Sequence, residues 1–119
     1  MMMKESFWVS RGVFAMTARD DRAFDLTRRR AESVAVVSAL NAKALKLTQA
    51  IAGSEMEILR LELEIARNPE NRQLVQELHE MEESAETMRE AQVSCAGEIA
   101  AAEEDVAALD QLIAAAKGG

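Results

Sequence analysis

Apolar residues spaced alternately three and four positions apart run through most of this chain, and a single proline interrupts them. From Val37 this spacing meets an apolar residue at eight of nine positions up to Ile65. From Leu74 it does so at twelve of thirteen positions up to Ala116, although only 49% of the residues are hydrophobic. A repeat of about 3.5 residues places its apolar members along one side of a helix and favours pairing with a second helix. The spacing therefore predicts two long coiled-coil helices.

The only proline, Pro69, lies between the two repeats, where both lose their phase. Asn68 has the residue type of an N-cap, Pro69 suits the first helical position, and Glu70 would be a favourable charge in the first turn. A short connection favours antiparallel neighbours. We therefore predict an all-α fold, a long antiparallel helical hairpin with an N-terminal aromatic arm. The arm covers residues 1–17 and the hairpin 18–119, with helices over about 18–67 and about 70–116 and a turn at 68–71.

Both repeats stay in phase when the helices are set antiparallel, with Leu47 opposite Gln92 and Ile58 opposite Met81. Cys95 falls on this seam and is expected to be a small core residue rather than a reactive thiol. The predicted hairpin core consists of the large apolar members of both repeats, namely Leu47, Ile51, Ile58, Leu61, Ile65, Leu74, Leu78, Met81, Met88, Ile99, Val106, Leu109 and Ile113.

A second apolar series lies on the opposite face of the first predicted helix. Four of its members, Leu45, Met56, Leu59 and Leu63, would form a long strip facing water in a monomer. Strips of this kind usually mark an interface. We therefore predict that another protein chain covers it, either by self-association or as a different partner. The alternative is that the N-terminal segment folds over the strip within one chain.

Three aromatic residues in the N-terminal arm, Phe7, Trp8 and Phe14, have no phase relation to either repeat. Because aromatic anchors often carry much of the binding energy of an interface, we expect this arm to dock on a partner. The arm does not read as a signal peptide, since Glu5 offsets Lys4 and charged residues interrupt the apolar run. No uninterrupted apolar stretch suits a membrane span. A cytoplasmic protein, or a part of a macromolecular assembly, is expected.

The net charge of −7 is unevenly distributed along the chain. Residues 1–72 contain 12 basic and 10 acidic side chains, whereas residues 73–119 contain only Arg89 and Lys117 against 11 acids. An acidic second helix argues against broad contact with phosphates. It also suits pairing with the basic residues Arg28, Arg29 and Arg30.

Motifs that carry catalysis are absent from the sequence: it has no Gly-rich phosphate loop, CxxC, HExxH or G-x-S-x-G. His79 and Glu83 are spaced to offer two metal ligands on a helix, but a histidine outside the seam is more simply a surface residue. We therefore expect no catalytic residue, cofactor, metal or small-molecule substrate.

In size and layout the chain resembles the small coiled-coil hairpins of bacterial type III secretion and flagellar export. Gln73, Leu74, Glu77, Arg89, Ala91 and Gln92 resemble the second helix of secretion needle subunits, although Asn68-Pro69 lies farther upstream and this chain is longer. The resemblance implies a stalk, chaperone or filament subunit. The residues by themselves favour a structural or adaptor protein, and also fit a phage virion assembly component or an acidic mimic of nucleic acid.

Overall fold

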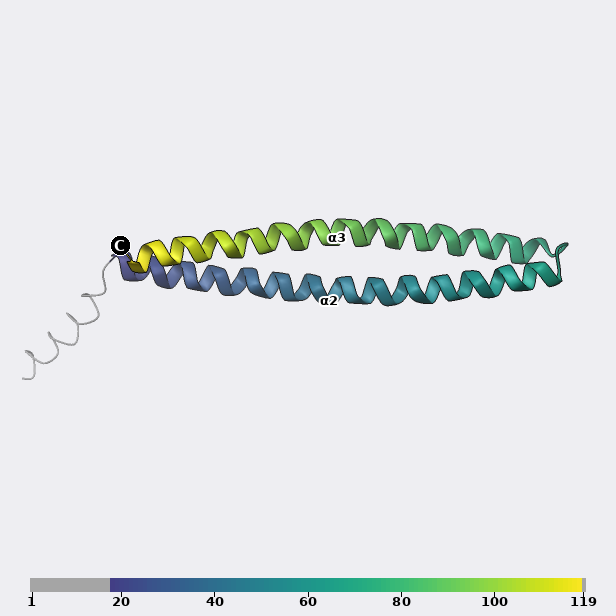
Figure 1. Cartoon of the computed structure of the whole chain (residues 1–119), viewed down its shortest axis with the longest axis horizontal. Coiled ribbons are helices and arrows are strands. Elements are labelled where there is room, and N and C mark those ends of the chain that lie inside the picture. The colour runs from purple at the N-terminus through teal and green to yellow at the C-terminus, as the bar shows by residue number, and fades with distance from the viewer. Residues whose placement is uncertain (1–17, 119) are drawn as a thin grey trace, which may run out of the picture. The chain divides into compact units, whose positions relative to one another are not determined.

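The computed structural model describes residues 18–118, which form two helices. Helix α2 spans Ala18–Arg67 and helix α3 spans Arg72–Gly118. These residues contain no strand. The segments of α3 lie antiparallel beside those of α2 (Figure 1), so the predicted all-α helical hairpin is confirmed.

The described chain divides into two packed parts. One contains residues 18–36 together with 102–118, and the other contains Val37–Ala101 with the turn. In each part a segment of α2 packs against a segment of α3 and buries its own apolar residues. Leu26 and Leu109 are buried in the first part, and Leu61 and Ala85 in the second.

The residues predicted to form the hairpin core lie on the protected side of their helices. Ile51, Leu61 and Leu109 are buried. Leu61 is the most protected of them, with 1% of its surface exposed. The others are half-buried, namely Leu47, Ile58, Ile65, Leu74, Leu78, Met81, Met88, Ile99, Val106 and Ile113. Because only two helices pack together, these side chains are only partly shielded from water.

The apolar spacing of α2 also extends upstream of Val37, the first residue of the repeat described above. Ala23 and Leu26 are buried, and the next two positions at the same spacing are the half-buried Arg30 and Ser33. Arg30 is tolerated there because its Nε atom donates a hydrogen bond to Asp110 of α3, so the charged end of the side chain stays at the edge of the seam.

Three polar contacts join α2 and α3, and the first of them agrees with the predicted register. Gln92 Nε2 donates a hydrogen bond of 3.1 Å to the hydroxyl of Thr48, the neighbour of its expected partner Leu47. The thiol of Cys95, a residue 1% exposed, donates to the carbonyl oxygen of Leu40 at 3.4 Å. Arg89 of α3 lies 3.5 Å from the carboxylate of Glu55.

The start of α3 differs from the sequence prediction, because α3 begins at Arg72 and Asn71, rather than Asn68, is its N-cap. The side-chain oxygen of Asn71 accepts hydrogen bonds from the backbone N–H groups of Gln73 at 3.1 Å and Leu74 at 3.4 Å. Asn68 instead ends α2, since its own N–H donates to the carbonyl of Glu64 at 2.9 Å.

The chain reversal uses residues 68–71, which leaves Asn71 in place to cap α3. The backbone N–H of Asn71 donates to the carbonyl of Asn68 at 3.1 Å, which closes a four-residue turn. Pro69 takes the second position of this turn, where its fixed φ angle is favoured. Glu70 also lies in the turn and not, as predicted, in the first turn of the helix.

We expect Asn71→Ala to lower the free energy of unfolding by about 1 kcal/mol, because it leaves two N–H groups of α3 without their side-chain acceptor. Asn68→Ala is the matched control. The Asn68 side chain makes only a 3.5 Å contact with the Glu64 carbonyl, so its removal should cost less. Urea unfolding followed by circular dichroism measures both, and an equal or larger loss for Asn68→Ala would contradict the assignment of the cap.

The register predicts that cysteines placed at Ile58 and Met81, with Cys95 changed to Ala, form a disulfide within one chain. Both positions are half-buried and belong to the same packed part. A disulfide requires Cα atoms within about 7 Å. Non-reducing electrophoresis and mass spectrometry distinguish the product, and crosslinking only between chains would contradict the hairpin register.

Candidate protein-binding interface

The outward side of α2 carries a continuous series of exposed residues, which we call the α2 strip: Ala42, Leu45, Gln49, Ala52, Met56, Leu59, Leu63 and Ala66. Its four large apolar side chains are the predicted interface residues. Leu45, Met56, Leu59 and Leu63 are exposed by 59%, 70%, 57% and 63%, respectively. The strip follows the same alternation of three and four residues as the seam but lies on the opposite side of the helix, so packing against α3 leaves it uncovered.

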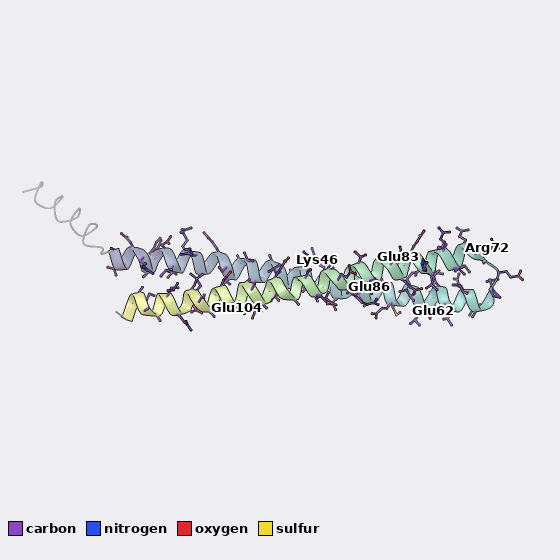
Figure 2. The ribbon with its side chains drawn as sticks, turned by 90° about the horizontal axis from the view of Figure 1, so that it is seen from above. Lys46, Glu62, Arg72, Glu83, Glu86 and Glu104 are labelled. Carbon is purple, nitrogen blue, oxygen red and sulfur yellow. The ribbon has the colours of Figure 1, made fainter. Side chains whose placement is uncertain are left out.

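Charged residues of opposite sign border the α2 strip. Lys46, Arg60 and Arg67, which directly follow Leu45, Leu59 and Ala66, form its basic edge. Glu57 and Glu64 lie farther from the strip on the same side of the helix. Glu55 and Glu62 directly precede strip residues and form its acidic edge. Figure 2 labels Lys46 and Glu62 on α2, and all five side chains of the two edges are exposed. Counting apolar positions missed these edges, although the residues on either side of each repeat position would have revealed them.

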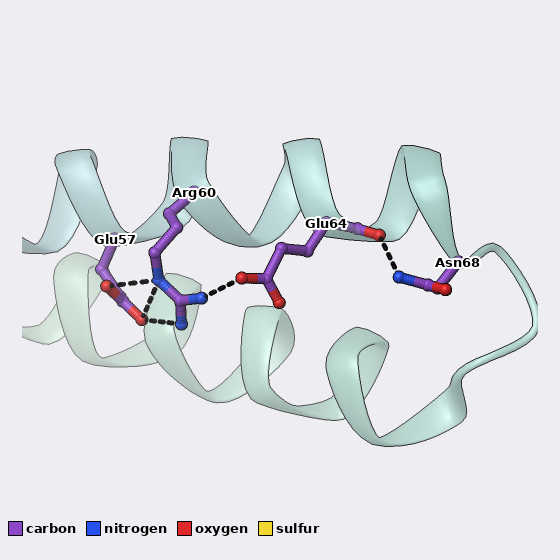
Figure 3. A network of polar contacts seen from close by, with 4 residues as sticks. All are labelled: Glu57, Arg60, Glu64 and Asn68. Atoms are coloured by element: carbon purple, nitrogen blue, oxygen red, sulfur yellow. Dashed lines mark hydrogen bonds and ion pairs between the residues drawn. The ribbon is translucent and has the colours of Figure 1, made fainter.

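One residue of the basic edge, Arg60, is held in place by its own helix (Figure 3). Its Nε atom donates to both carboxylate oxygens of Glu57 at 3.1 Å, and its Nη1 atom donates to Glu64. The hydrogen bonding that Arg60 donates to Glu57 raises the pKa of Arg60 and lowers the pKa of the Glu57 carboxyl. The guanidinium group is therefore charged and fixed beside the strip.

The predicted aromatic anchors of the N-terminal arm, Phe7, Trp8 and Phe14, lie outside the described residues. Phe24, near the start of α2, is 68% exposed. Docking of the arm on a partner therefore stays a prediction, and the α2 strip is the apolar surface whose geometry is known.

Two of the three clustered arginines, Arg28 and Arg30, pair with acids of the chain itself. Arg28 donates to Asp25 and to Glu32, each at 2.7 Å, and Arg30 pairs with Asp110. The hydrogen bond to Asp25 raises the pKa of Arg28. Ion pairing within residues 18–118 thus engages Arg28 and Arg30 and leaves less of their charge for phosphates.

His79 is exposed, whereas Cys95 is buried in the seam. Within residues 18–118 no group of three or more histidine, cysteine or acidic side chains is arranged to hold a metal ion. Neither α2 nor α3, as described, is apolar over a length that could cross a membrane. The feature that stands out is the α2 strip.

Comparisons with models of protein families, with curated proteins and with solved structures find no match for this chain. The candidate interface consists of an apolar strip on one helix, a basic edge anchored in part by Glu57 and Glu64, and an acidic edge.

Proposed function

We propose that this protein is a non-enzymatic structural coiled coil that assembles protein chains through the α2 strip. The observation that carries the proposal is the exposure of Leu45, Met56, Leu59 and Leu63 along one face of a single helix. Each large apolar side chain left in water forgoes roughly 1.5–3 kcal/mol of burial energy. A partner that covered all four would recover much of this energy.

The surroundings of the strip favour a protein partner over a lipid surface or a nucleic acid. Amphipathic helices that lie on membranes are flanked by lysine and arginine, whereas this strip has Glu55 and Glu62 along one edge. The net charge of −7 opposes binding to phosphates. Apolar residues at coiled-coil spacing between two charged edges are typical of a helix that packs against another helix.

We expect the wild-type protein at tens of micromolar to have a solution mass above the 13.1 kDa of one chain. The double variant Leu59→Glu, Leu63→Glu should have the mass of a monomer, because it places unpaired charges in a desolvated interface. Both side chains are exposed within the hairpin, so the helical content should remain. Multi-angle light scattering and circular dichroism measure the two properties.

Val75→Glu, Val93→Glu is the matched control, since it adds the same charges at exposed apolar residues of α3. This control should retain the mass of the wild type. A wild-type protein that is monomeric under these conditions, or equal dissociation of both double variants, would contradict assembly through the α2 strip.

A further inference from the structure

We infer that the α2 strip is covered by the α2 strip of a second copy of this chain, lying parallel to it and in register. This inference rests on the proposed function and names the partner at the same surface. It is carried by the order of charges, with Glu55 and Glu62 on one edge and Lys46, Arg60 and Arg67 on the other.

The charges on the two edges determine whether two α2 helices pair in a parallel or an antiparallel orientation. In two parallel helices, the residue that directly precedes Met56 or Leu63 flanks the interface and faces the residue five places later in the other helix. Glu55 then faces Arg60 of the second copy, and Glu62 faces Arg67. A two-fold axis repeats both pairs. In antiparallel helices each edge would face itself, placing acid against acid and base against base, which is unfavourable.

The two pairs differ in what their members already contact. Arg60 pairs with Glu57 and Glu64 of its own helix, and Glu55 lies 3.5 Å from Arg89. For Glu62 and Arg67, by contrast, the described residues provide no ion pair, and both side chains are exposed. The pair formed by Glu62 and Arg67 is therefore the main determinant of orientation between copies.

The polar residue of the strip supports the same alignment. Gln49 interrupts an otherwise apolar series and is exposed. In register, its amide meets the amide of the other Gln49, and each can donate to and accept from the other. A shifted or antiparallel alignment that sets this amide against a leucine or methionine would leave it unpaired in an apolar layer. Single polar residues at such positions are known to fix register.

Cysteine crosslinking of the full chain tests orientation directly. In a Cys95→Ala background, Leu45→Cys and Ala66→Cys are prepared as separate variants at opposite ends of the strip. In a parallel pair in register, each new cysteine lies close to the same cysteine of the second chain. Both variants should therefore form disulfide-linked dimers on mild oxidation. If neither variant crosslinks with itself although the protein self-associates, the copies are not parallel and in register, and the inference is wrong.

Charge exchange tests the pair between Glu62 and Arg67. Glu62→Arg and Arg67→Glu should each weaken the dimer by on the order of tenfold, because each sets like charges together twice. An equal mixture of the two variants should restore the wild-type affinity through heterodimers. Glu83→Arg, at an exposed glutamate of α3, should leave the affinity unchanged. Sedimentation equilibrium gives the dissociation constants.

Failure of this inference is distinguishable from failure of the proposed function. An oligomer that Leu59→Glu, Leu63→Glu dissociates, but that shows no rescue in the mixture, overturns the parallel pairing and leaves assembly through the strip intact. A monomeric wild type with no crosslink at either cysteine overturns both. A monomer in which Met56 resists oxidation would show instead that the N-terminal residues of the same chain cover the strip.

Discussion

Burial of apolar side chains between α2 and α3 holds the hairpin together, and this seam is thin. Few large side chains are fully withdrawn from water, with Leu26 and Leu61 the clearest, and most of the remaining seam residues are half-buried. Two helices cannot enclose a side chain from all directions, so each seam residue keeps one side near solvent. The position of every other surface, including the α2 strip, follows from which side of each helix this seam occupies.

Polar contacts adjust the seam without replacing it. Gln92 with Thr48, and Arg30 with Asp110, join the helices at or beside positions where the apolar repeat lapses. Exposed ion pairs contribute little to stability individually, so their larger effect is to favour one alignment of the helices over its neighbours. In the proposed dimer, likewise, the apolar residues of the strip supply the affinity and the charged edges select the orientation of the helices.

The α2 strip connects this packing to function. A helix with two apolar stripes can satisfy only one of them inside a hairpin, because its opposite side has no intramolecular neighbour among the described residues. Leu59 and Leu63 therefore remain at the surface in the isolated chain. We propose that assembly completes the burial that the hairpin begins, and that Glu62 and Arg67 make this second step specific for a parallel copy.

The sequence by itself determined that the chain forms two helices, where they are interrupted, and which stripe of each helix is apolar, because periodicity and a lone proline are local properties. Only the tertiary structure decided that Asn71 rather than Asn68 caps α3, since that choice depends on how many residues the reversal consumes. It also decided that Arg30 occupies the seam. The apolar repeat in the sequence does not predict a cation at this position. The structure accommodates Arg30 there because its guanidinium group pairs with Asp110 of α3.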